Sequence, residues 1–275
     1  MATALVTGGT SGIGAEFARQ LAMSGYDLVL VARNPERLAS VAERLHADSG
    51  INVETVRADL SDRRDVARVA ARIEAAEHPI DLLVNNAGEG FRTALASPDL
   101  AAHEHAFEVM CRAVLVLGGA AARSMSGRGG TIINISSLQT YLATGAYAAN
   151  KAWVTAYSQS LAVELKGTAV GVTVVLPGWV RTEWHERAGV QRSSLPGFLW
   201  TEPSAVVRGA LRDARRGRVV SIPTVRYRVL GWFARHLPNS VLRRASAAIS
   251  SSRNEAAPSG EALGAEPTAM KADTA

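Results

Sequence analysis

Two side chains suited to proton transfer stand four positions apart in the segment Tyr147-Ala148-Ala149-Asn150-Lys151. Residues at this spacing share one face of a helix, so Lys151 is expected one turn from Tyr147 on the same side. A free tyrosine has a pKa of about 10, and a neighbouring ammonium lowers that pKa because it stabilises the phenolate. The pair can therefore give a proton to the alkoxide that forms when hydride reduces a carbonyl.

Two serines precede this pair, directly after an apolar run that ends Asn134-Ile135. A hydroxyl at the carboxyl end of a strand can hold and polarise a substrate oxygen. We assign this role to Ser137, with Ser136 as the alternative. The predicted catalytic residues are therefore Ser137, Tyr147 and Lys151.

A glycine-rich turn stands near the start of the chain, Thr7-Gly8-Gly9-Thr10-Ser11-Gly12-Ile13-Gly14. It lies between a strand-like run and a helix-like segment. Gly8, Gly12 and Gly14 allow a tight turn and close approach of the backbone to a pyrophosphate, which the N-terminus of the following helix favours. The turn is a predicted dinucleotide-binding element rather than only a strand-to-helix connection.

The second strand-like run ends Val31-Ala32-Arg33. An NAD-binding site usually has an acidic residue here that binds the ribose 2′-hydroxyl. Arg33 instead suits a 2′-phosphate, because a guanidinium forms charge-assisted bidentate bonds with phosphate. We therefore predict NADP as the cofactor, against the alternative that Arg33 is only a solvated loop residue.

Strands and helices are predicted to alternate through most of the chain. The strand-like runs are Ala4–Val6, Asp27–Val31, Val53–Arg57, Asp81–Val84, Thr131–Ile135, Gly171–Leu176 and Val219–Ile222, with helical segments near 13–24, 35–48, 62–76, 99–124, 146–166 and 203–215. This alternation, with nearly continuous apolar strands, predicts a single doubly wound α/β (Rossmann) domain with a seven-stranded parallel sheet.

The last fifth of the chain has a different pattern. Residues 225–248 are predicted to form one or two amphipathic helices, and the segment from Ser251 is polar, without periodicity, and predicted to be disordered. The predicted organisation is a catalytic domain over 1–222, a helical extension over 223–250 and a tail over 251–275.

Taken together, these motifs resemble those of the short-chain dehydrogenase/reductase family, in particular an NADP-preferring bacterial subgroup. The matching motifs are Thr7–Gly14, Asp59-Leu60, Asn85-Asn86-Ala87-Gly88, Ser137, Tyr147 with Lys151, and Pro177-Gly178 with Thr182. The resemblance implies that the coenzyme is bound by Gly8, Thr10, Ser11, Gly12, Ile13, Gly14, Arg33, Asp59, Leu60, Asn86, Ala87, Gly88, Tyr147, Lys151, Pro177, Gly178, Val180 and Thr182.

Two features depart from the family's pattern. An asparagine that commonly holds a water in a proton relay is replaced here by Met110, whose thioether cannot hold such a water in the same way. Ser137 also precedes Tyr147 by only ten residues, which is a shorter loop than is usual in the family. Both features concern rate and substrate more than the type of reaction.

Composition excludes some other classes of protein. Cys111 is the only cysteine, so no intrachain disulfide can form, and a cytoplasmic location without a signal peptide is expected. The net charge of +5 is spread over dispersed arginines, which argues against nucleic-acid binding. No metal site is predicted.

The substrate is predicted to be an apolar carbonyl compound: a 3-oxoacyl thioester, a steroid-like ketone or a lipophilic aldehyde. The candidate pocket-wall residues are Phe91, Leu138, Leu142, Trp179, Trp184, Phe198 and Trp200. The predicted activity is NADPH-dependent transfer of hydride between the nicotinamide and a carbonyl or hydroxyl group. The alternative is a catalytically weak nucleotide-binding regulatory or structural protein, which only Met110 supports.

Two further predictions concern assembly and the helical extension. Ala148, Ala152, Ala156 and Ser160 form a small-residue stripe that permits close helix packing, and a homodimer or tetramer is expected. The extension is expected to cover the edge of the core. Binding to an anionic membrane surface or to a phosphate-rich carrier are the less favoured alternatives.

Overall fold

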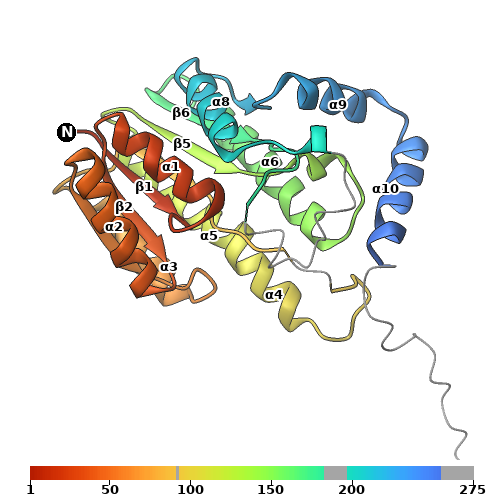
Figure 1. Cartoon of the computed structure of the whole chain (residues 1–275), viewed down its shortest axis with the longest axis horizontal. Helices are drawn as coiled ribbons and strands as arrows, with labels where there is room; N and C mark the ends of the chain where they lie inside the picture. Colours follow the sequence, from red (N-terminus) through yellow and green to blue (C-terminus); the bar gives the residue numbers. More distant parts are fainter. Residues whose placement is uncertain (91–92, 183–196, 255–275) are drawn as a thin grey trace, which may run out of the picture.

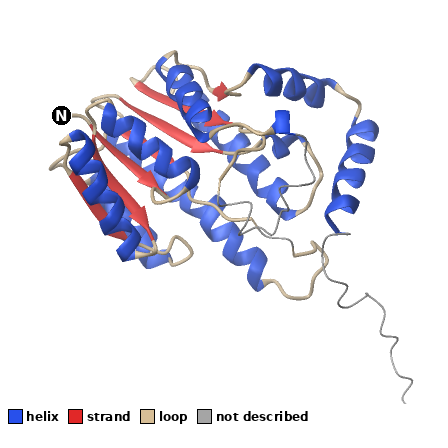
Figure 2. Ribbon diagram, viewed as in Figure 1, coloured by secondary structure: helices blue, strands red, loops and turns tan. Residues whose placement is uncertain are grey.

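The computed structural model describes residues 1–90, 93–182 and 197–254. They contain one sheet of seven parallel strands in the order β3-β2-β1-β4-β5-β6-β7 (Figures 1 and 2). The strands are β1 Thr3–Thr7, β2 Asp27–Ala32, β3 Val53–Arg57, β4 Leu82–Asn85, β5 Gly130–Ile135, β6 Val170–Val175 and β7 Val220–Ser221. The predicted doubly wound α/β fold is confirmed.

Helices cover both faces of the sheet (Figure 2). One face packs against α1 Gly12–Met23, α2 Pro35–Ser49 and α8 Pro203–Arg215. The other face packs against α3 Arg63–Glu74, α5 Ala113–Met125 and α6 Ala146–Glu164. Strand residues alternate between the two layers: Ala4 and Val6 lie in the first core and Leu5 in the second, as the two-residue period of a strand requires.

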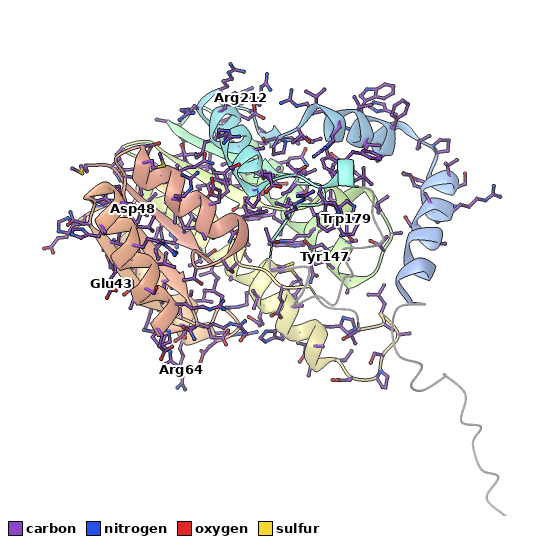
Figure 3. The ribbon with its side chains drawn as sticks, viewed as in Figure 1. Glu43, Asp48, Arg64, Tyr147, Trp179 and Arg212 are labelled. Carbon is purple, nitrogen blue, oxygen red and sulfur yellow. The ribbon has the colours of Figure 1, made fainter. Side chains whose placement is uncertain are left out.

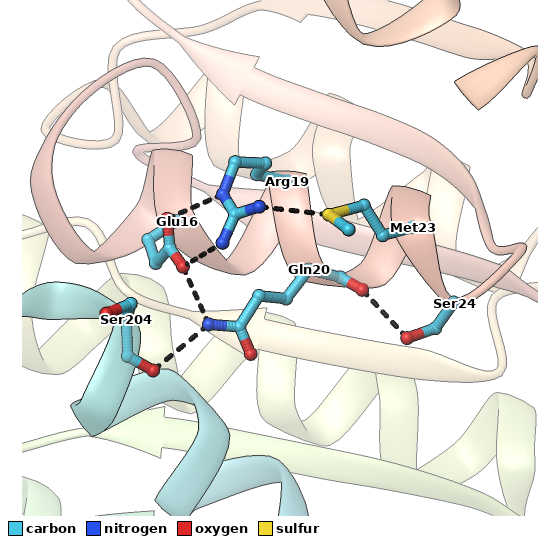
Figure 4. Close-up of polar contacts among 6 residues, drawn as sticks. All are labelled: Glu16, Arg19, Gln20, Met23, Ser24 and Ser204. Atoms are coloured by element: carbon cyan, nitrogen blue, oxygen red, sulfur yellow. Dashed lines mark hydrogen bonds and ion pairs between the residues drawn. The ribbon is translucent and has the colours of Figure 1, made fainter. Parts of the chain in front are cut away.

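Polar contacts join two helices of the first layer (Figure 4). On α1, the Gln20 side-chain amide donates to the Glu16 carboxylate at 2.6 Å and to the Ser204 carbonyl oxygen of α8 at 3.1 Å. Arg19 forms an ion pair with the same carboxylate at 2.7 Å. The start of α8 is thereby held against α1, the helix that follows the glycine turn.

The segment predicted as one helix near 99–124 is divided into three parts. It comprises α4 Ala101–Phe107, the π-helical turn η1 Glu108–Arg112 and α5. The stretch Ala101–Met125 is long and apolar enough to cross a membrane by length and composition, but 56% of its apolar 18-residue window is buried inside the protein. It is a core helix, since α5 packs against α3 and the sheet.

The C-terminal extension forms two helices, α9 Val225–His236 and α10 Asn239–Asn254, at one side of the molecule (Figure 1). The predicted end of the helical extension at residue 250 is wrong, because α10 continues to Asn254. Alanine and serine side chains are compatible with a helix, and no proline occurs before Pro258 to stop it. The rest of the predicted tail, 255–275, lies outside the described residues.

Candidate active site

A cavity of about 920 Å³ lies at the carboxyl ends of the strands. Its walls come from the loops after β1, β2, β3, β4, β5 and β6, together with α6 and α9. Strand order reverses between β1 and β4, and ligands of open α/β sheets bind at such a reversal. Tyr147 and Trp179, which both line this cavity, are labelled near the centre of Figure 3.

Nearly all of the residues predicted to bind a coenzyme line the cavity. Every one of them lines it except Gly14. A Cβ at Gly14 would stand 2.2 Å from the Gly8 carbonyl oxygen and 2.3 Å from Nδ2 of Asn86, distances that no side chain can occupy. Gly14 therefore allows α1 to pack closely on the turn, rather than contacting a ligand itself.

The glycine turn has the backbone that its sequence requires. Gly8 and Gly12 have φ values of +65° and +55°, which favour glycine because a Cβ is strained there. The turn is fixed from the neighbouring loop, where the Asn86 side-chain amide donates to the Thr7 carbonyl oxygen at 3.0 Å. Thr7 Oγ1 in turn accepts from the backbone N–H groups of Asn86 and Ala87 at 3.0 and 3.1 Å. Asn86 thus has a structural role as well as a place in the cavity wall.

One end of the cavity is rich in charge. Arg33 is exposed there, and Asp59 stands beside it at the end of β3. Burial raises the pKa of Asp59, but hydrogen bonds from the Ser61 backbone and hydroxyl and the nearby Arg33 charge outweigh burial and hold that pKa below its usual value. A smaller hollow of about 170 Å³ adjoins this end, lined by Arg33, Arg57, Asp59, Asp65 and Arg68.

The predicted acid and its neighbour lie together at the other end. Lys151 Nζ lies 5.7 Å from the centroid of the Tyr147 ring, one turn along α6. The ammonium is buried and donates to the Ile135 carbonyl oxygen at 2.9 Å, which fixes its position at the end of β5. Burial lowers the pKa of Lys151 to about 8, since it disfavours the charged form. The two side chains thus meet at the cavity, as the spacing predicted.

The structure distinguishes the two serines at the end of β5. Ser136 is buried, and its hydroxyl donates to the Lys151 carbonyl oxygen at 2.8 Å and lies 2.8 Å from Thr155 Oγ1. It therefore joins β5 to α6. Ser137 is only half-buried, and its Oγ accepts from the Gln139 backbone N–H at 3.2 Å, at the start of the short helix η2 Leu138–Tyr141. Ser137 is the serine whose hydroxyl remains available to donate to a substrate oxygen.

Met110 lies in the π-helical turn beneath the cavity. It is fully buried, and its Cγ would stand 3.7 Å from a Cβ at Gly88, the residue that borders the Lys151 ammonium. The next residue, Cys111, is also buried, and burial raises the pKa of its thiol to about 12. Buried apolar side chains therefore stand at the position where the family resemblance leads one to expect an asparagine. π-helical turns inside helices are frequent at functional sites.

Helix α9 forms a wall of the cavity that sequence reasoning did not foresee. Tyr227, Leu230, Gly231 and Ala234 all line the cavity from this helix. The Tyr227 hydroxyl accepts from the Trp179 backbone N–H at 3.0 Å and donates to the Leu199 carbonyl oxygen at 2.5 Å. The three- and four-residue spacing of these side chains was the only sequence signal that could have identified this face.

The prediction of the pocket-wall residues is only partly correct. Leu138, Leu142 and Trp179 line the cavity. Phe198 and Trp200 do not: Phe198 is 69% exposed, and Trp200 is buried against Trp179 with 6.0 Å between ring centroids. Phe91 and Trp184 lie outside the described residues.

Comparison with known proteins decides the family. The model of the short chain dehydrogenase family matches residues 2–192. The chain is a short-chain dehydrogenase/reductase. Members of this family are oxidoreductases that act on alcohol and ketone groups with a nicotinamide coenzyme. The family predicted from the motifs is therefore confirmed.

Three relatives of this short-chain dehydrogenase/reductase are informative. An uncharacterised oxidoreductase of Staphylococcus saprophyticus is 37% identical over 183 residues, 65% of this chain and 78% of the relative. A short-chain dehydrogenase from Sphingobium yanoikuyae, solved in complex with NADPH, is 32% identical with a TM-score of 0.77, and the match covers 97% of this chain and 99% of the other. A bulky-bulky ketone specific alcohol dehydrogenase from Comamonas testosteroni is 28% identical with a TM-score of 0.73, and 98% of each chain is covered.

Proposed function

We propose that this short-chain dehydrogenase/reductase is an NADPH-dependent reductase of apolar carbonyl compounds, or the corresponding alcohol dehydrogenase. The observation that carries the proposal is the arrangement of Tyr147 and Lys151 in one cavity with the glycine turn, with 5.7 Å between the ammonium and the phenol ring. The walls of this cavity include both the phosphate-binding turn and the proton donor.

The roles of the side chains follow from their positions. A bound nicotinamide supplies or accepts the hydride at the carbonyl carbon. The Ser137 hydroxyl donates a hydrogen bond to the carbonyl oxygen and polarises it. Tyr147 gives its phenolic proton to the same oxygen as negative charge develops there. The Lys151 ammonium, held by the Ile135 carbonyl oxygen, stabilises the phenolate that remains.

The residues around the glycine turn fit a dinucleotide. The glycines of the turn have no side chain that would keep a pyrophosphate away from the backbone. Helix α1 begins within the turn, at Gly12. Arg33 stands at the end of the cavity where an adenosine 2′-phosphate would lie, and the adjoining hollow adds Arg57 and Arg68. This excess of guanidinium groups supports NADP over NAD, as does the NADPH bound in the Sphingobium relative.

The coenzyme assignment is tested by binding. Coenzyme dissociation constants are measured for NADPH and NADH with the wild type and Arg33→Ala. A charge-assisted bond contributes about 1.5–3 kcal/mol, so Arg33→Ala should weaken NADPH binding roughly tenfold or more. NADH binding should change little. Equal weakening of both coenzymes would contradict the assignment, and Arg44→Ala, an exposed arginine on α2, is the matched control.

The apolar substrate is inferred from the wall opposite the glycine turn. Leu138, Leu142, Trp179, Leu230 and Ala234 supply mainly hydrocarbon surface there. Such a surface favours a bulky apolar group attached to the carbonyl. The prediction is tested with a panel of ketones and aldehydes of increasing chain length and ring size: kcat/KM should rise with apolar bulk. Turnover of small polar carbonyls alone would contradict the inference.

The rival function is a nucleotide-binding protein without turnover, which Met110 favours because no polar relay side chain stands at that place. The geometry of Tyr147 and Lys151 argues against it, since a protein that only binds nucleotide does not need a phenol and a buried ammonium together. NADPH consumption with the same carbonyl panel separates the two. The reductase should turn over and Tyr147→Phe should lose at least a hundredfold in kcat, as removal of a general acid does.

A further inference from the structure

Helix α9 has two apolar faces. The inner face, with Tyr227 and Ala234, lines the cavity. The outer face is formed by Val225, Val229, Trp232 and Phe233, whose side chains are 71%, 50%, 58% and 50% exposed. A helix on the surface of a globular protein normally has one apolar stripe, which faces the core. Within the described part of the chain, packing at the cavity therefore explains why the inner face is apolar. It does not explain why the outer face is apolar.

The outer residues form a continuous surface. Positions 225, 229, 232 and 233 follow the spacing of one helix face, opposite positions 227 and 234. The Trp232 ring contacts that of Phe233, with 5.1 Å between centroids. Leu237, directly after α9, and Val241 on α10 are also apolar and are 40% and 43% exposed. A contiguous exposed apolar patch marks an interaction surface, whereas single scattered apolar side chains do not.

The sequence segment that contains this patch carries formal charge of one sign. Residues 214–254 contain nine arginines and no aspartate or glutamate, while the whole chain carries only +5, so the remainder of the chain is net negative. Arg228 and Arg235 stand two helical turns apart along the border of the patch. Among the described residues, neither forms an ion pair with a carboxylate; Arg228 donates to the Ile222 carbonyl oxygen at 2.9 Å.

We propose that the outer face of α9, together with the arginines beside it, docks on an anionic lipid surface. A helix that lies in the membrane interface buries Trp, Phe and aliphatic side chains among the acyl chains and places arginines at the headgroups. The combination of an exposed aromatic pair with two arginines along its border fits this partner. The sequence favoured covering of the core's edge for this segment, whereas the inner face of α9 lines the cavity. The outer face supports the membrane alternative.

Two other occupants fit the patch less well. In a twofold contact, a second copy would bring the same arginine-rich segment against itself, and juxtaposed like charges oppose association. The C-terminal segment 255–275 is acidic but contains only two large aliphatic side chains, Leu263 and Met270, too few to cover four exposed apolar residues. An anionic bilayer matches both the charge and the apolar area.

Flotation with lipid vesicles tests the proposal on the full-length protein. Vesicles containing phosphatidylglycerol are compared with vesicles of phosphatidylcholine alone. The wild type should float with the anionic vesicles, and binding should fall with added salt because charge is screened. Trp232→Ser with Phe233→Ser should weaken the partition coefficient at least tenfold. Arg228→Gln with Arg235→Gln should weaken it roughly 25-fold, at about fivefold for each arginine near an anionic surface.

Matched controls separate vesicle binding through this face from nonspecific binding by other exposed side chains. Leu95→Ser with Leu100→Ser removes two exposed apolar side chains elsewhere, and Arg44→Gln with Arg64→Gln removes two exposed arginines on α2 and α3. Both should bind anionic vesicles like the wild type. Circular dichroism and NADPH binding of every variant report that the fold is kept. Flotation does not depend on turnover, so failure of the reductase assignment would leave its result unchanged.

Three results would overturn the proposal. The first is absence of wild-type binding to anionic vesicles. The second is equal binding by all variants, including those on α9. The third concerns the variant Trp232→Ser with Phe233→Ser: its molar mass in light scattering changes, but its vesicle binding does not fall. That result would show that a second copy covers the face.

Discussion

The contact between Gly178 and Tyr227 places α9 against the cavity, and Gly178→Ala tests it. A Cβ at Gly178 would stand 2.0 to 2.3 Å from three carbon atoms of the Tyr227 ring. Carbon atoms pack at about 3.5–4.0 Å, so the ring would have to retreat by roughly 1.5 Å. The φ angle of Gly178 is not in the left-handed region, so alanine is allowed by the backbone and the clash alone is tested.

The expected loss in free energy of unfolding follows from the two consequences of that retreat of the ring. Overpacking costs about 1–3 kcal/mol. The Tyr227 hydroxyl also loses its bonds to the Trp179 N–H and the Leu199 carbonyl oxygen, and each neutral hydrogen bond contributes about 1 kcal/mol. Gly178→Ala should therefore lower the free energy of unfolding by roughly 3–5 kcal/mol. It should also raise the KM for the carbonyl substrate, because Tyr227 lines the cavity.

A double-mutant cycle separates the clash from other effects. The free energy of unfolding is measured by urea denaturation for Gly178→Ala, Tyr227→Ala and the two together. In the Tyr227→Ala background the new methyl has room, and Gly178→Ala should change stability by less than about 0.5 kcal/mol. Gly197→Ala is the matched control, since a Cβ there meets nothing within 4 Å. If Gly178→Ala is as mild as Gly197→Ala, or equally costly in both backgrounds, the inferred packing of α9 is wrong.

Two further predictions concern buried groups. Because burial lowers the pKa of Lys151 to about 8, the ammonium form is lost as pH rises through that value, and kcat/KM for carbonyl reduction should fall along a single-proton limb above about pH 8. A profile that stays level up to pH 10 would show that the ammonium form is not required. Cys111, fully buried with a thiol pKa of about 12, should resist alkylation by iodoacetamide at pH 8 until urea unfolds the protein. Rapid alkylation of the native protein, followed by mass spectrometry, would contradict this burial.

Sequence reasoning succeeded where the signal is local. The glycine turn, Tyr147 with Lys151 and the seven strands all depend on spacing within a short segment, so the sequence alone located them. The sequence predicted a doubly wound parallel sheet but not the order of its strands, which the structure supplies. Residues brought together by these local patterns line one cavity in the structure.

The remaining features depend on packing between distant segments. The difference between the two serines depends on burial, which spacing does not reveal: Ser136 is enclosed against α6, and Ser137 is not. The π-helical turn at Met110 was not foreseen because its residues continue an ordinary helical pattern. The inner face of α9 was missed because an amphipathic pattern does not reveal which element the helix will cover. Predictions of a cytoplasmic location and of a homo-oligomer through α6 stay predictions.

Transfer of deuterium from the coenzyme tests the central claim most directly. NADPH deuterated at the transferable C4 position is incubated with the protein and the apolar carbonyl panel, and the alcohol products are analysed by mass spectrometry. The account predicts deuterium on the carbinol carbon for the wild type and little or none for Tyr147→Phe, although both proteins bind NADPH. Tight NADPH binding without deuterium in any product, or equal transfer by Tyr147→Phe, would contradict it.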